Sequence, residues 1–129
     1  MNRTWHIALA LSAAALGLAA APSQGPQLSR VMRDKLVHAQ KILEAVVTSD
    51  WASMETHSQD LERLTRDPGW AVLTFPEYAT HSAAFVRAIQ DLQKAAAQHD
   101  ADKAPQAYTA VTLTCVECHR YLAKARIAR

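Results

Sequence analysis

The 129-residue chain carries a C-x-x-C-H run near its end, Cys115-Val116-Glu117-Cys118-His119. On a helix, two thiols three positions apart lie on one face, so they can reach the two vinyl groups of a single porphyrin. The imidazole of the next residue can then ligate the iron. Cys115 and Cys118 are the only cysteines in the chain. The spacing therefore predicts one covalently attached haem c, with His119 as an axial iron ligand.

Three other interpretations of the run remain open. A Cys115–Cys118 disulfide can form in an oxidising compartment, but a redox C-x-x-C belongs in a thioredoxin-like βαβ context that this sequence lacks. A zinc site of this type needs four ligands, and the sequence has no second paired Cys/His cluster. The third interpretation is that the C-x-x-C-H spacing arises by chance. Haem attachment accounts for both cysteines and the histidine together.

The N-terminal sequence has the features of a secretory signal peptide. Arg3 supplies an early positive charge, and an apolar, alanine-rich stretch runs from Ile7 to about Ala21. This stretch is shorter than the roughly 20 residues that span a bilayer. We expect a signal peptide over residues 1–23, cleaved at about 20–23, and one mature domain over 24–129. Because bacterial haem c attachment occurs outside the cytoplasm, we expect a periplasmic protein without stable membrane insertion after processing.

Composition and patterning favour an all-α fold. The formal net charge is +2, or +1 without Arg3, which gives no argument for nucleic-acid binding. Aromatic residues make up 6% of the chain and glycines number three, too few for a β-sandwich of this size. Apolar periodicity predicts four helices, over about 28–48, 52–66, 76–96 and from 100 or 102 onward. Short links predict an up-down-up-down antiparallel four-helix bundle.

Each predicted helix has an expected inward face, and Asp67-Pro68-Gly69 is a strong break between the second and third. The connection from Trp70 to Phe75 is expected to fold onto the bundle. The inward positions are Met32, Leu36, Ala39, Leu43 and Val46; Met54, Leu61 and Leu64 or Thr65; Tyr78, Ser82, Phe85, Ile89, Leu92 and Ala96; and Tyr108, Val111, Cys115, Cys118, His119 and Leu122.

The predicted topology puts Met32 near the haem. Met32 lies roughly 6 Å along the first helix and His119 roughly 10 Å from the same end of the bundle, at about 1.5 Å per residue. A thioether sulfur is an established second axial ligand of haem iron. Alternatively, Met32 only fills the core. His81 is the rival ligand, since it lies early in the third helix at the same end.

Other candidate ligands are predicted to lie elsewhere. Met54, His57 and His99 belong to the opposite end or lie far from the haem layer, and His38 is rotated about 240° from Met32 at about 100° per residue. We therefore expect His38 on the outer face of the first helix.

The sequence resembles the class II c-type cytochromes, the cytochrome c′ and cytochrome c-556 family. The likeness rests on the late C-x-x-C-H motif, the four-helix pattern over about 28–126, and Val31-Met32-Arg33 in the first helix. It implies thioether bonds to Cys115 and Cys118, His119 as proximal ligand, and Met32 as the ligand typical of the c-556 branch. Ala123 departs from many cytochromes c′, which carry a basic residue four positions after the proximal histidine.

The predicted coordination implies a function. With His119 and Met32 both bound to iron, the haem would be six-coordinate and low-spin, and the protein would act as an electron carrier for redox partner proteins. A five-coordinate haem would instead bind nitric oxide or carbon monoxide, as cytochromes c′ do. The sequence contains no recognisable catalytic constellation, so we do not expect an enzyme. Related bundles often dimerise through their first two helices, which makes a homodimer an alternative to a monomer.

Basic residues cluster after the motif, at Arg120, Lys124, Arg126 and Arg129. They either complement the negative end of the last helix or form a docking surface for an acidic redox partner.

Overall fold

The computed structural model describes residues 24–127, and the side chains within residues 25–125. This part of the chain contains four helices and no strand: α1 (Gln24–Thr48), α2 (Trp51–Leu64), α3 (Pro76–Ala97) and α4 (Lys103–Ile127). The predicted all-α class is confirmed for these residues. The predicted signal peptide, residues 1–23, lies outside the described residues.

The two shortest connections are built in the same way. Ser49 follows α1 with a φ of 56°, and His99 follows α3 with a φ of 50°. A residue in this left-handed region ends a helix and turns the chain sharply. Asp50 then accepts a hydrogen bond of 3.0 Å from the Ser53 amide, and Asp100 accepts one of 2.9 Å from the Lys103 amide. Each aspartate therefore caps the next helix.

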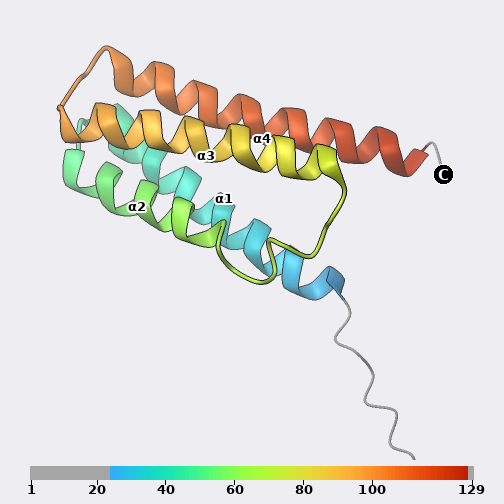
Figure 1. The fold of residues 1–129 in the computed structure, drawn as a ribbon. Helices are drawn as coiled ribbons and strands as arrows, with labels where there is room; N and C mark the ends of the chain where they lie inside the picture. The colour runs from blue at the N-terminus through green and yellow to red at the C-terminus, as the bar shows by residue number, and fades with distance from the viewer. Residues whose placement is uncertain (1–23, 128–129) are drawn as a thin grey trace, which may run out of the picture.

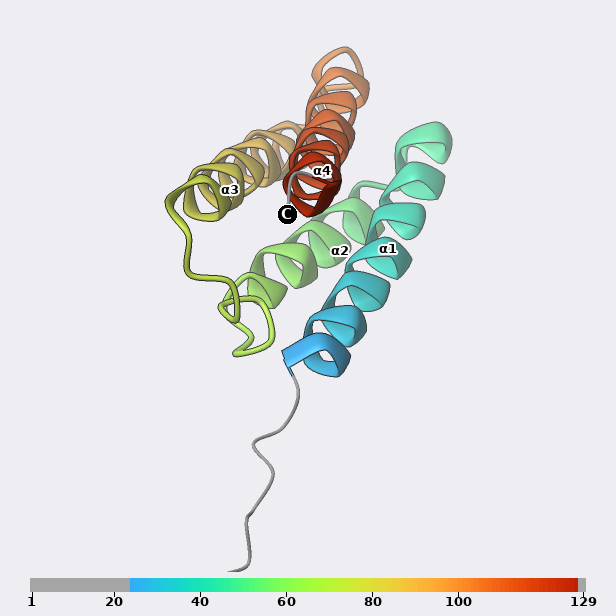
Figure 2. The same ribbon diagram turned by 90° about the vertical axis from the view of Figure 1, so that its right-hand side faces the viewer.

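The helices form a bundle-like arrangement (Figure 1). The start of α1, the start of α3 and the end of α4 lie at one end of the molecule, and the α1–α2 and α3–α4 connections lie at the other. Figure 2 shows α1 alongside α2 and α3 alongside α4. The packing agrees with this view, since α1 contacts α2 extensively, α3 contacts α4 extensively, and α1 contacts α4 only sparsely.

The core forms where the predicted inward faces of α2, α3 and α4 meet. Leu61 of α2, Phe85 and Ile89 of α3, and Val111 of α4 are buried as predicted. Pro76 occupies the first turn of α3, where its missing N–H costs no hydrogen bond.

The predicted inward face of α1 is partly wrong. Leu36 and Leu43 are 58% and 48% exposed, whereas Lys35 and Ile42, each one position earlier, are 8% and 0% exposed. The apolar stripe of α1 is wide enough to pack against two other helices. Only the side that faces α2 and the core is buried. The sparse α1–α4 contact leaves the other side open. Met32 lies at the edge, half-buried and packed against the core.

The connection between α2 and α3 folds onto the bundle as expected. Asp67 accepts hydrogen bonds of 2.9 and 3.1 Å from the Arg30 guanidinium and one of 2.7 Å from the Gly69 amide. A Cβ on Gly69 would lie 3.0 Å from both the Gln27 carbonyl oxygen and Val31 Cγ2, so only glycine lets the loop approach α1 this closely. The loop thereby inserts Trp70 into the core.

Candidate functional site

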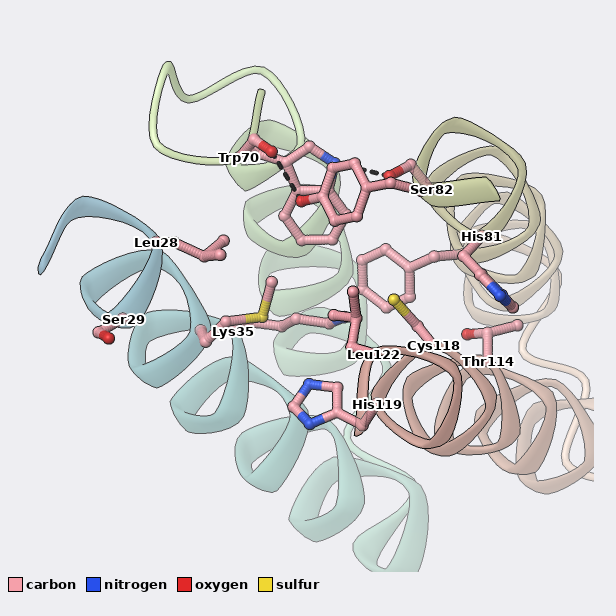
Figure 3. A pocket seen from close by; sticks show the side chains of 13 residues that line it. Leu28, Ser29, Lys35, Trp70, His81, Ser82, Thr114, Cys118, His119 and Leu122 are labelled. Atoms are coloured by element: carbon pink, nitrogen blue, oxygen red, sulfur yellow. Dashed lines mark hydrogen bonds between the residues drawn. The ribbon is translucent and has the colours of Figure 1, made fainter. Parts of the chain in front are cut away.

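The C-x-x-C-H motif lies in the second half of α4. Cys115 and Cys118 are free thiols, half-buried and packed against the core. The sequence expectation that His119 points inward is not met, because its side chain is exposed. Its ring extends from α4 into the space toward α1 (Figure 3). The exposure follows from the sparse contact between α1 and α4, which leaves the motif beside an open groove.

Two cavities lined by both Met32 and His119 adjoin the motif. The larger, of about 320 Å³, lies between α1, α3, α4 and the α2–α3 connection, and Met32, Cys118 and His119 all line it. A volume near 300 Å³ is at the lower end of the range for cofactor sites. The second, of about 180 Å³, lies between α1 and α4 and is lined by Met32, Cys115 and His119. Met32 and His119 thus border both cavities, from facing helices.

Aromatic side chains form the far wall of the larger cavity. The Trp70 and Phe85 rings stack with centroids 5.5 Å apart, and the Tyr78 hydroxyl donates a hydrogen bond of 2.6 Å to the Trp70 carbonyl. The Trp70 indole N–H donates one of 3.1 Å to the Ser82 hydroxyl (Figure 3). Burial raises the pKa of Tyr78 to about 12, so its hydroxyl remains a donor. The wall is therefore largely apolar, and its buried polar side-chain atoms have hydrogen-bond partners.

Lys35 is an unexpected occupant of this region. It is only 8% exposed, and its Nζ lies 3.6 Å from the Phe85 ring centroid and 4.9 Å from that of Trp70. Such contacts stabilise a cation through the negative faces of the rings. Burial nevertheless lowers the pKa of Lys35, and interactions with Cys115 and Cys118 oppose that shift. The ammonium is thus held in an apolar site near both thiols.

The Lys35 position was missed by sequence reasoning, although one signal was available. Lys35 follows Val31 by four positions and precedes Ile42 by seven, and both of these residues are fully buried. A helical residue with that spacing shares their face. The charge of the side chain concealed the signal, since buried lysines are rare.

The Cys118 thiol does not resemble that of a redox-active cysteine. Burial raises the pKa of Cys118, with only partial opposition from the positive charge of Lys35. Reactive cysteines instead have lowered pKa values in electropositive, accessible surroundings. Burial therefore makes the Cys118 thiol a poor candidate for thiol–disulfide exchange.

The structure separates the candidate ligands that could replace Met32 by their distance from the motif. His81 lines the larger cavity, half-buried, with its ring centroid 5.3 Å from that of Tyr121. Met54 is fully buried in the core, and His99 stacks on Trp51 near the opposite end, with centroids 5.3 Å apart. Of these three, only His81 can compete for the position facing His119.

The predicted location of His38 is wrong. It is half-buried rather than on an outer, solvated face, and its Nδ1 lies 3.1 Å from Nδ1 of His57 on α2. The rotation from Met32 was correct, but that direction points toward α2 and not toward solvent.

The basic residues after the motif are exposed where they are described. Arg120 and Lys124 lie on the surface of α4, and Arg120 also borders a shallow apolar hollow beside Cys115 and Val116. The side chains of Arg126 and Arg129 lie outside the described residues. In α1, Arg30 forms an ion pair with Asp67, with 2.9 Å between Arg30 Nη2 and Asp67 Oδ2.

Comparisons with known protein families, with curated proteins and with solved structures found no match to this chain. Within residues 24–127, none of the four helices combines the length and apolar character needed to cross a lipid bilayer.

Proposed function

We propose that this chain is a periplasmic monohaem c-type cytochrome that carries electrons between partner proteins. Cys115 and Cys118 hold one haem c through thioether bonds, His119 is one axial iron ligand and Met32 is the other. The four helices then act as an up-down-up-down antiparallel bundle that closes around the haem. The likeness of the sequence to cytochrome c-556 supports the same assignment.

One observation carries this proposal. Met32 of α1 and His119 of α4 line the same two cavities, and each cavity also contains one of the two cysteines. Two attachment thiols, a nitrogen donor and a sulfur donor are therefore gathered from two helices around neighbouring apolar spaces. This donor set fits a covalently bound haem with both axial positions filled by protein.

Each part of the site has a physical role in that function. A bound haem supplies a one-electron couple at its iron. The thioether of Met32 favours the reduced state and raises the reduction potential. The wall of Trp70, Tyr78 and Phe85 gives the larger cavity an apolar surface against which a porphyrin could pack. The imidazole of His119 would offer a ring nitrogen to the iron, since its side chain is exposed beside both cavities.

Covalent attachment is tested by mass spectrometry of protein exported to the periplasm. We expect the mass of the processed chain plus one haem, and loss of the haem from a Cys115→Ala/Cys118→Ala variant. A bare polypeptide from cells with an active haem-attachment system would contradict the proposal.

The axial ligand is tested by absorption spectroscopy of the oxidised and reduced protein. We expect a low-spin spectrum with a methionine-to-iron charge-transfer band, and loss of that band in Met32→Leu, which keeps the apolar volume. Met54→Leu is the matched control, since Met54 is buried away from the motif, and it should keep the band. His81→Asn, at the rival position, should also keep it.

The same spectra distinguish the alternative function. A high-spin wild-type spectrum that changes readily with carbon monoxide or nitric oxide would assign gas binding instead of electron transfer. The sixth position would then be open, and Met32 would be a packing residue.

A further inference from the structure

A cluster of metal-ligating side chains lies between α1 and α2, away from the motif on α4. His38 comes from the middle of α1, His57 from the middle of α2 and Asp60 from the last turn and a half of α2. None of the three lines either cavity beside Cys115, Cys118 and His119. All three are half-buried, so they are sheltered from bulk water but still accessible to a small ion.

The distances suit a single metal ion. His38 Nδ1 lies 3.1 Å from His57 Nδ1 and 3.5 Å from Asp60 Oδ2, and His57 Nδ1 lies 4.0 Å from the same oxygen. Ligands at about 2.0–2.2 Å from a tetrahedral zinc ion are roughly 3.3–3.5 Å apart. A small separation of the two imidazoles, together with a small movement of the Asp60 carboxylate toward His57, would bring all three donor atoms into this range.

Arg63 already orients the carboxylate. Its guanidinium contacts Asp60 Oδ1 at 2.7 Å, which leaves Oδ2 directed at the two imidazoles. Such outer contacts fix the direction of a ligand and are a regular part of metal sites. His57 and Asp60 also lie three positions apart on α2, so one helix face presents both.

The pair of imidazoles is the strongest indication of a ligand. Two Nδ1 atoms 3.1 Å apart can share only one proton, with one ring donating and the other accepting. A metal ion replaces that proton and uses both lone pairs. A polar hollow of about 230 Å³ that His57 lines, together with Asp50 and Ser53, gives water a route to a fourth coordination position.

We propose that His38, His57 and Asp60 form a second metal site, which binds Zn²⁺ with one water and ties α1 to α2. Two imidazoles and one carboxylate suit a borderline ion such as Zn²⁺, whereas Mg²⁺ and Ca²⁺ prefer oxygen ligands alone. The site is independent of the haem, because it shares no ligand with the C-x-x-C-H motif.

Calorimetric titration of the untagged, purified protein with ZnCl₂ tests the proposal. We expect one tight site per chain, and binding at least about 100-fold weaker in His57→Gln and in Asp60→Asn, because outer-shell changes alone cost about 10–100-fold. His99→Asn and Asp91→Asn are the matched controls, which remove an exposed imidazole and an exposed carboxylate elsewhere. Asparagine also tolerates the left-handed backbone at His99. Both controls should bind zinc as the wild type does.

X-ray absorption at the zinc edge, which is separate from that of iron, identifies the ligands. We expect only nitrogen and oxygen neighbours, at about 2.0–2.2 Å. Sulfur neighbours at about 2.3 Å would place the zinc at Cys115 and Cys118 and overturn the proposal. It would equally be overturned if the wild type bound no zinc, or if His57→Gln and Asp60→Asn bound it unchanged. Zinc binding by the wild type and its loss in His57→Gln and Asp60→Asn do not depend on whether the haem assignment is right.

Discussion

Replacing Tyr78 with phenylalanine removes one hydroxyl from the wall of the candidate haem cavity. Tyr78 is 4% exposed, and its hydroxyl donates a hydrogen bond of 2.6 Å to the Trp70 carbonyl. Phenylalanine keeps the ring, so the change is confined to this bond and to a carbonyl that loses its donor. We expect the free energy of unfolding to fall by about 1–3 kcal/mol at neutral pH.

The same hydroxyl predicts a dependence on alkaline pH. Burial raises the pKa of Tyr78 from 10.0 to about 12. An acid whose pKa is raised on folding contributes stability that is complete below its unfolded pKa and is lost as the pH rises through its folded pKa. Two pKa units correspond to at most about 2.7 kcal/mol, which water at the cavity edge reduces to about 1–2 kcal/mol. The difference in free energy of unfolding between the wild type and Tyr78→Phe should therefore fall by that amount between pH 10.0 and about 12.

Urea unfolding followed by far-UV circular dichroism measures both effects. Tyr108→Phe is the control, because the half-buried Tyr108 hydroxyl donates a hydrogen bond of 3.0 Å to the Ala39 carbonyl, where water can replace it. We expect a loss of about 0.5–1 kcal/mol at neutral pH from that change. Equal losses from the two substitutions, or an advantage that does not change with alkaline pH, would refute the reasoning that burial sets the contribution of Tyr78.

Two further predictions concern α1. Ile42→Ala should lower the free energy of unfolding by about 2–5 kcal/mol, because Ile42 is fully buried. The adjacent Leu43→Ala should lower it by less than about 1 kcal/mol, because Leu43 is exposed. Similar losses from the two substitutions, measured by urea unfolding, would contradict the observed orientation of α1. Lys35→Met should raise the thermal midpoint at neutral pH, because burial penalises the ammonium and lowers the pKa of Lys35 below 10.5. As the pH rises toward 10.5, the unfolded wild-type chain keeps its Lys35 proton longer than the folded chain does, so the wild type gains stability. The increase in thermal midpoint from Lys35→Met should therefore shrink over that range. An increase that stays constant with pH in melting scans would exclude the charge of Lys35 as its cause.

Much of the site can be predicted from local sequence, because its chemistry depends on local spacing. The haem-attachment prediction rests on Cys115, Cys118 and His119, which one helix places within little more than a single turn. Helix ends are local as well, since α2 ends at Leu64, shortly before Asp67-Pro68-Gly69, and Pro76 begins α3.

The partners across the bundle depend instead on how the helices rotate against one another. The apolar stripe of α1 was compatible with burial of Leu36 or of Ile42, and only the packing against α2 and the core selects Ile42. The same rotation carries Lys35 under the aromatic wall. A one-position shift of the buried face changes every contact along a helix, and a pattern of single residues does not determine it.

The sequence by itself determined the haem-attachment prediction and the four helices, because both depend on spacings of a few residues. The tertiary structure decided which distant side chains meet. It brings Met32 and His119 to shared cavities, and it brings His38 to His57 across the 19 positions that separate them. Such meetings depend on the relative rotation and height of packed helices, which arise only when all the side chains are packed together.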